Sequence, residues 1–290
     1  STPGGAEFGA SVVLSAGFEP WAGASVATSG ADDVYVAYFG GDMEVLLASS
    51  HDGGATWSHS TIDGGPRFEG QLSLTTYGDS VYVLTNGVDM AARGLQLYRS
   101  ADGGATFATT ALPDVGLMYF DVLVDPRNGD VYVVGDDPTI HHAVSHDGGA
   151  TFSDYTRVDE AYAVYFSDYS IGQLGRVVVA GGGMDLETSV WNVDADAWSR
   201  GPGGQPVESE RVSAAIDAAD HIHVISVAMG AVTLTSSTDS GATYSSVPVA
   251  SGSEADIAPS TFVVGAPVIY NDAGVIRYAF VPNPPALVPR

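Results

Sequence analysis

The sequence predicts an all-β fold of six repeated units, each made of four antiparallel strands, which is the architecture of a six-bladed β-propeller. Two recurring phrases carry this prediction. One is a turn, SHDGGATWS from Ser50, which returns as SADGGATFA from Ser100, SHDGGATFS from Ser145 and STDSGATYS from Ser237. The other is a short run of β-branched and aromatic residues upstream of each turn. A repeated period of this kind is typical of a repeat architecture.

The second phrase marks one buried strand in every unit. Its copies read Val34-Tyr35-Val36, Val81-Tyr82-Val83, Val131-Tyr132-Val133, Val177-Val178-Val179, Ile222-His223-Val224 and Ile276-Arg277-Tyr278. Their central residues fall at 35, 82, 132, 178, 223 and 277, so the steps are 47, 50, 46, 45 and 54. Adjacent positions are apolar, which predicts strands buried on both faces.

The second unit shows where the other strands fall. We predict strands over Gln71–Thr76, Val81–Leu84, Leu95–Arg99 and Thr106–Leu112, with the recurring turn before the fourth. No helical periodicity of useful length interrupts this pattern. Four antiparallel strands in a unit of about 45 residues match one propeller blade.

The recurring turn has the chemistry of a β-hairpin. Glycine adopts positive φ, and Asp and Ser side chains bond nearby backbone N–H groups. The aromatic residue that closes each copy would start the next strand and fill an apolar gap. We therefore interpret the turns as structural, with these aspartates at their centres: Asp52, Asp102, Asp147, Asp194 and Asp239.

The two ends of the chain predict how the propeller closes. The first eight residues, STPGGAEF, align with STDSGATY, and an outer strand is expected over 11–15. The last unit would supply strands at Pro267–Asn271 and Val275–Val281, and a third from 286–290. A blade shared by both termini would close the ring and leave no open edge, so we predict a single domain over 1–290. The final Leu-Val-Pro-Arg, 287–290, also matches the remnant of a thrombin-cleavable tag, and both interpretations remain open.

The turn resembles the Asp box of bacterial sialidases and BNR-repeat proteins, S-x-D-x-G-x-T-W; a shorter relative, NVDADAWS, begins at Asn192. The resemblance implies a sialidase-like six-bladed propeller. Sialidases hold the substrate carboxylate with three arginines, the first in an F-R-I-P motif. Here that place reads Phe18-Glu19-Pro20-Trp21, and only Arg67, Arg211 and, more weakly, Arg277 could approach the site. The resemblance therefore implies the scaffold without the arginine triad, and argues against a true sialidase.

Composition narrows the possible partners. The chain has 35 acidic and 10 basic residues, a net charge of −25, which disfavours nucleic acid and anionic membranes. There is no Cys, so no disulfide framework indicates a compartment. No apolar run reaches about 18 residues. We expect a secreted, cell-surface or periplasmic monomer whose signal peptide has been removed.

Ligands of propellers usually bind on loops at one mouth of the central channel, and each unit brings an acid to the corresponding stretch. We predict ligand-binding residues at Glu19, Trp21, Arg67, Tyr119, Tyr162 and Arg211. Four carboxylates are candidates for catalysis: Glu69, Asp121, Glu210 and Asp256. Two functions remain open. We favour a module that binds carbohydrate or another extracellular partner; the alternative is a glycoside hydrolase that uses two of these carboxylates.

Metal binding is a further possibility. The same four carboxylates could hold a Ca²⁺ ion in the channel, because calcium takes six to eight oxygen ligands. No cofactor is required by either function. His221 and His223 point to one side of a strand, a spacing seen in zinc sites. His223, however, occupies the position of Tyr35, Tyr82 and Tyr132, so we interpret it as a packing residue and assign no zinc.

Overall fold

The structure is a computed structural model of the 290-residue chain. It describes residues 13–14, 23–65, 71–86, 94–113, 116–117, 119–136, 139–157, 165–182, 187–195, 197–200, 211–257, 266–272 and 275–281.

The chain divides into two compact units, and each is described by itself. The first comprises Ser1–Val124, Gly129–Val133 and Ala143–Tyr155, and the second comprises Asp125–Asn128, Val134–His142 and Thr156–Arg290. A single domain over the whole chain therefore stays a prediction.

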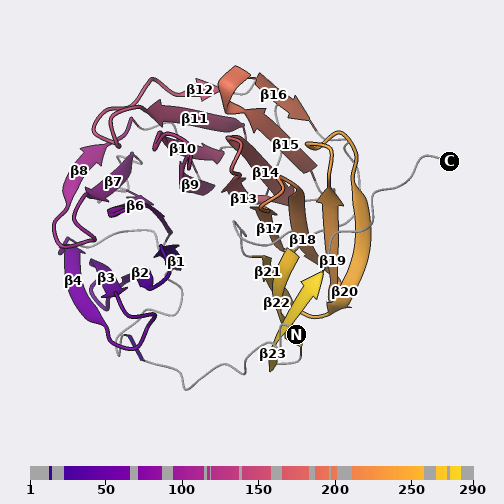
Figure 1. Ribbon diagram of the computed structural model, residues 1–290, viewed down its shortest axis with the longest axis horizontal. Coiled ribbons are helices and arrows are strands. Elements are labelled where there is room, and N and C mark those ends of the chain that lie inside the picture. Colours follow the sequence, from indigo (N-terminus) through magenta and orange to yellow (C-terminus); the bar gives the residue numbers. More distant parts are fainter. Residues whose placement is uncertain are drawn as a thin grey trace. The chain divides into compact units, whose positions relative to one another are not determined.

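The described residues form six antiparallel sheets, which we number in chain order (Figure 1). Sheet 1 contains β1 (Ala24–Ser29), β2 (Asp33–Phe39), β3 (Val45–Ser50) and β4 (Ser58–Asp63). Sheet 2 contains β5 (Leu72–Tyr77), β6 (Ser80–Asn86), β7 (Leu95–Ser100) and β8 (Ala108–Ala111). Sheet 3, whose strands belong to both units, contains β9 (Tyr119–Val124), β10 (Val131–Asp136), β11 (Ile140–Ser145) and β12 (Thr156–Arg157).

The other three sheets lie in the second unit. Sheet 4 contains β13 (Tyr165–Ile171), β14 (Arg176–Gly182), β15 (Glu187–Asn192) and β16 (Ala197–Arg200), with a short 3₁₀ helix, η1 (Val193–Ala195), before β16. Sheet 5 contains β17 (Arg211–Ile216), β18 (Ile222–Ala228), β19 (Ala231–Ser237) and β20 (Ser245–Ser251). Sheet 6 has three described strands, β21 (Glu254–Ile257), β22 (Ala266–Asp272) and β23 (Val275–Val281).

The all-β prediction and the four-strand unit are confirmed. The recurring Val-Tyr-Val phrase lies on the second strand of sheets 1 to 3, and β10 is buried at every position. Burial on both faces is what a continuous apolar run requires. Within the first unit, Tyr35 and Leu47 of sheet 1 pack with Leu74 and Val83 of sheet 2 in one core cluster.

The sixth repeat differs from the prediction. Sheet 6 begins with β21, so Ala266–Asp272 is its second strand and Val275–Val281 its third. Val224, the partner of Ala214 on the second strand of sheet 5, corresponds to Val268, the partner of Ile257 on the second strand of sheet 6. The distance between these two repeats is therefore 44 residues (224 to 268), and not the predicted 54. The apolar phrase at 276–278 belongs to the strand after the expected one.

The predicted closure by residues 1–8 and 286–290 lies outside the described residues. Of the expected strand over 11–15, only Val13 and Leu14 are described, and neither is in a strand. Across the described parts of the chain, no helix is long and apolar enough to span a bilayer.

Candidate functional site

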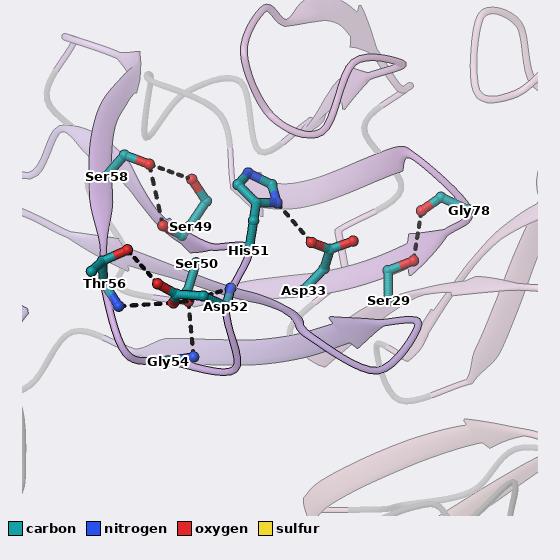
Figure 2. Close-up of polar contacts among 10 residues, drawn as sticks. All are labelled: Ser29, Asp33, Ser49, Ser50, His51, Asp52, Gly54, Thr56, Ser58 and Gly78. Carbon is teal, nitrogen blue, oxygen red and sulfur yellow. Dashed lines mark hydrogen bonds and ion pairs between the residues drawn. The ribbon is translucent and has the colours of Figure 1, made fainter.

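Four of the turns share one hydrogen-bond frame, drawn for the first in Figure 2. The Ser50 hydroxyl donates to Asp52 Oδ1 (2.8 Å) and accepts the Gly54 N–H (2.8 Å). Asp52 also accepts the Thr56 N–H at Oδ1 (2.8 Å) and the Thr56 hydroxyl at Oδ2 (2.6 Å). The same contacts recur around Asp102, Asp147 and Asp239. Each carboxylate is thus held by donors from its own turn.

These donors keep the aspartate carboxyl groups of the turns ionised. Hydrogen bonds from the Thr hydroxyl, then from its backbone N–H and the Ser hydroxyl, lower the pKa of Asp52 and Asp102 to about 2. The pKa values of Asp147 and Asp239 are lowered by the same groups. A folded-state pKa below the unfolded 3.8 gives stability that is present at neutral pH and lost as the pH falls towards 2.

The fifth turn is built differently. Asn192 replaces the first serine and accepts the Ala195 N–H (3.2 Å), and Asp194 lies on η1. Asp194 accepts two hydrogen bonds from Arg127 (2.8 and 2.9 Å). Arg127 also binds the buried Asp125 at 2.6 Å. An ion pair to a neighbouring turn therefore replaces the internal frame.

An open pocket of about 320 Å³ lies over the first turn. It is lined by Ser49, His51, Asp52, Thr56, Trp57 and Ser58. Trp57 donates its indole N–H to the Gly54 carbonyl (2.9 Å), which fixes the ring. His51 Nδ1 lies 2.7 Å from Asp33 Oδ1 on the opposite strand (Figure 2).

The turn uses most of the polar atoms in this pocket. Both oxygens of Asp52 and the Thr56 hydroxyl are engaged in the frame. The Ser49 and Ser58 hydroxyls bond each other at 3.2 Å and keep spare lone pairs. His51 Nε2 makes no hydrogen bond to a described residue. The pocket therefore offers a ligand one aromatic ring and mainly hydrogen-bond acceptors.

The aromatic residues of three other turns contact the cores of their units. Phe107, Phe152 and Tyr244 pack against core clusters of their units. The residues before and after them also differ, because Arg99 and Ala108 occupy the places of Ser49 and Ser58 in sheet 2. The combination of Trp, His and two serines belongs to the first turn among the four described copies of the frame.

A second set of polar contacts links the first strands of successive sheets. In each contact, a backbone N–H on the first strand of one sheet donates to a side chain on the first strand of the preceding sheet. The four contacts are Leu74 to Ser25 (3.2 Å), Val122 to Ser73 (3.1 Å), Ala214 to Asp168 (2.7 Å) and Ile257 to Ser213 (3.4 Å). These contacts satisfy backbone donors at a sheet edge. Asp121 and Asp256 occupy the same repeat position, which runs 25, 73, 121, 168, 213 and 256.

In the second unit this position brings two carboxylates to one hydroxyl. Ser213 Oγ donates to Asp256 Oδ1 (2.6 Å) and is also hydrogen-bonded to Asp168. Burial, and then the charge of Asp256, raises the pKa of Asp168 to about 6 against opposing hydrogen bonds. A serine has one proton, so a protonated Asp168 completes the chain Asp168–Ser213–Asp256.

Six predicted site residues lie outside the described residues: Glu19, Trp21, Arg67, Glu69, Tyr162 and Glu210. The other four are described, and they lie on strands, not on the loops where they were expected. Tyr119 and Asp121 are on β9 of the first unit, and Arg211 and Asp256 are on β17 and β21 of the second. Asp168 was not predicted; the signal that could have found it is its spacing from Asp121 and Asp256.

Two of the arginines considered for a sialidase site already face acids. Arg211 lies 3.5 Å from Glu254, and Arg277 donates to Asp272 at 2.6 Å. The histidine pair surrounds Asp217: His223 Nε2 lies 3.2 Å and His221 Nδ1 3.3 Å from its Oδ2. Burial lowers the pKa of His223, ahead of the opposing effect of Asp217. No group of three or more His, Asp or Glu side chains suited to a metal is found within the described ranges.

Comparison with known proteins identifies the fold. No protein-family model and no curated protein sequence matches the chain. A triple arginine mutant of AofleA from Arthrobotrys oligospora is 11% identical, with a TM-score of 0.60 over 90% of this chain and 83% of that one. The SapL1 lectin in complex with alpha methyl fucoside is 14% identical, with a TM-score of 0.58 over 91% and 97%. The GH74 enzyme of Niastella koreensis is 15% identical, with a TM-score of 0.62 over 88% of this chain and 44% of that one.

These similar structures are β-propellers, and the chain has a β-propeller fold, with which six blades are consistent. At these identities the likeness establishes the fold and leaves the function to the sites described above.

Proposed function

We propose that this protein is a carbohydrate-binding module and that the pocket over the first turn holds one sugar ring. The observation that carries the proposal is the meeting of Trp57, His51 and the Ser49–Ser58 hydroxyl pair in one pocket. A pyranose has an apolar C–H face and a rim of hydroxyl donors. An indole supplies rigid apolar contact area, and the acceptors around it match the hydroxyls.

Size and charge narrow the ligand class. A volume of about 320 Å³ is at the small end for a ligand pocket, so it suits a single ring of a longer glycan. Asp52 is ionised and its oxygens are occupied, and the chain carries a net charge of −25. Both features repel anions, so the preferred ligand is a neutral sugar.

The comparisons support this proposal through the fold only. SapL1 is a lectin whose structure contains alpha methyl fucoside, so a propeller of similar size serves sugar binding there. From composition we further propose that this protein acts outside the cell as a monomer. Binding of a Ca²⁺ ion by the four channel carboxylates stays a separate prediction, since Glu69 and Glu210 lie outside the described residues.

Replacing Trp57 tests the pocket. Glycan-array screening, with calcium and with chelator, should identify a neutral glycan, and calorimetry should then show that Trp57→Ala weakens its binding about tenfold, because the stacking platform is lost. Trp57→Phe should keep part of the affinity. His146→Ala, an exposed histidine of the third turn, is the matched control and should bind normally. A blank array, or equal affinity of Trp57→Ala and the wild type, would contradict the proposal.

A second candidate function is glycoside hydrolysis, favoured by the pair Asp168 and Asp256. Their carboxyl groups share the Ser213 hydroxyl, so bonded oxygens lie within about 6 Å of each other. Retaining glycosidases use carboxyl groups about 5–5.5 Å apart, one protonated and one ionised. Burial raises the pKa of Asp168, which favours the protonated form that the acid of such a pair needs.

Different substitutions test hydrolysis and sugar binding separately. If the pair is catalytic, a panel of neutral glycans should release reducing ends, and Asp256→Asn should reduce the rate at least about a hundredfold. If the pair acts without the pocket, Trp57→Ala should leave this rate unchanged. Absence of turnover across the panel, or full activity of Asp256→Asn, would remove this candidate.

A further inference from the structure

The His51–Asp33 pair has a counterpart elsewhere in the chain. Val34 pairs with Ser50 across sheet 1, which places Asp33 opposite His51, and the two side chains meet at 2.7 Å. The third turn repeats this arrangement with His146 Nδ1 and Asp130 Oδ1 at 3.0 Å. Asp33 and Asp130 both directly precede a Val-Tyr-Val strand.

The turns do not need this pair. Where histidine is absent, its partner is absent too: the corresponding positions are Ala101 with Ser80 in sheet 2, and Thr238 with His221 in sheet 5. Those turns keep the full Ser–Asp–Thr frame. The side chains of His51 and Asp33 are 57% and 37% exposed, and a pair at that exposure adds little stability.

The pair instead controls His51 Nε2, which makes no hydrogen bond to a described residue. Hydrogen bonding of Nδ1–H to a carboxylate fixes the imidazole tautomer and leaves Nε2 as an acceptor. The ring is also held at its edge by Tyr35, with ring centroids 6.0 Å apart at 79°. Position and tautomer are thus both set before a ligand arrives, which lowers the entropic cost of binding.

We propose that Asp33 is a positioning residue that presents His51 Nε2 as the acceptor for one hydroxyl of the bound sugar, next to the ring face on Trp57. This inference rests on the proposed function, because it assumes that the pocket binds a sugar. It assigns the ligand a specific requirement: a hydroxyl donor adjacent to the C–H face that stacks on the indole. A sugar that lacks this hydroxyl should bind less well.

Asp33→Ala is the test, read by two measurements. Nitrogen NMR of the imidazole should show the wild-type His51 protonated at Nδ1, and a shift towards the Nε2–H form in Asp33→Ala. Calorimetry with the glycan found on the array should show binding weakened about three- to tenfold, the range for one hydrogen bond. Asp33→Asn, whose amide oxygen can still accept Nδ1–H, should restore both the tautomer and most of the affinity. Asp130→Ala, the same change in the third turn, should bind as the wild type.

The outcomes separate this inference from the proposed function. If Trp57→Ala loses binding but Asp33→Ala binds normally and keeps its tautomer, the positioning role is wrong and the pocket stands. If Trp57→Ala binds normally, the proposed function itself fails. If Asp33→Ala melts early, the tautomer of His51 in the folded variant still decides the matter, because a loss of stability alone would not move the proton from Nδ1 to Nε2.

Discussion

Asp168→Asn should make the protein more stable than the wild type at pH 8 and equally stable at pH 4. The folded-state pKa of Asp168 is raised to about 6 by burial and by Asp256, against the ordinary value of 3.8 for an aspartate. The stability tied to its protonated form is therefore fully present below pH 3.8 and is lost as the pH rises through about 6. A difference of about 2 pKa units corresponds to about 3 kcal/mol.

Asparagine should avoid this loss without leaving a donor unsatisfied. Its amide oxygen can accept the Ala214 N–H, which Asp168 Oδ2 binds at 2.7 Å, and its amide nitrogen can donate to Ser213. Thermal melts between pH 4 and pH 8 should show the variant and the wild type diverging as the pH rises. Such a gain in stability would mark Asp168 as a candidate functional residue, because active sites are often less stable than their neutral replacements.

Asp256→Asn is the matched control for this prediction. It removes the charge that helps raise the pKa of Asp168, but Asp168 still titrates. Its melting curve should therefore keep the pH dependence, with a midpoint at lower pH. Parallel melting curves for Asp168→Asn and the wild type across the whole range would show that Asp168 is not held in a protonation-sensitive environment.

The repeated strands and turns could be predicted because each is determined by residues that are close together in the sequence. Val81-Tyr82-Val83 is a buried strand from its side chains alone, and Asp102 followed by two glycines is a turn by its backbone requirements. For the sixth repeat the sequence predicts the second strand at 275–281, one strand too late, because Ala266–Asp272 and Val275–Val281 are both apolar. Which of the two strands pairs with β21 depends on contacts between segments that are distant in the sequence, and these contacts cannot be predicted from composition.

The candidate sites were harder to predict for a related reason. Asp168 lies inside a strand, YFSDYSI, where a polar residue gives no indication of its partners on β17 and β21. From the sequence, Trp57 is interpreted as one more structural aromatic, because the first and third turns differ only there, by Trp57 against Phe152. The structure adds that Phe152 packs on the core of its unit and that Trp57 lines the open pocket, and the sequence of the turn indicates neither.

Arg127→Ala should destabilise the second unit by about 3 kcal/mol, the cost of leaving a buried charge without its partner. The Asp125 side chain is fully buried, and Arg127 Nη2 contacts its Oδ2 at 2.6 Å while Nε contacts both oxygens at 3.0 and 3.2 Å. After the substitution, Asp125 keeps the Arg127 backbone N–H (2.9 Å), but no cation remains to balance its charge. Chemical denaturation should show the loss directly.

The other end of the same guanidinium provides the control. Asp194 accepts two hydrogen bonds from Arg127, at 2.8 and 2.9 Å, but its side chain is 69% exposed. Removing it leaves no buried group unpaired, so Asp194→Ala should cost far less than Arg127→Ala. Arg127→Lys should fall between them, because an ammonium cannot make the forked contacts to both carboxylates at once. Suppose Asp194→Ala and Arg127→Ala reduced the free energy of unfolding by the same amount. The contact between Arg127 and the fifth turn, and not the burial of Asp125, would then be what stabilises the fold here.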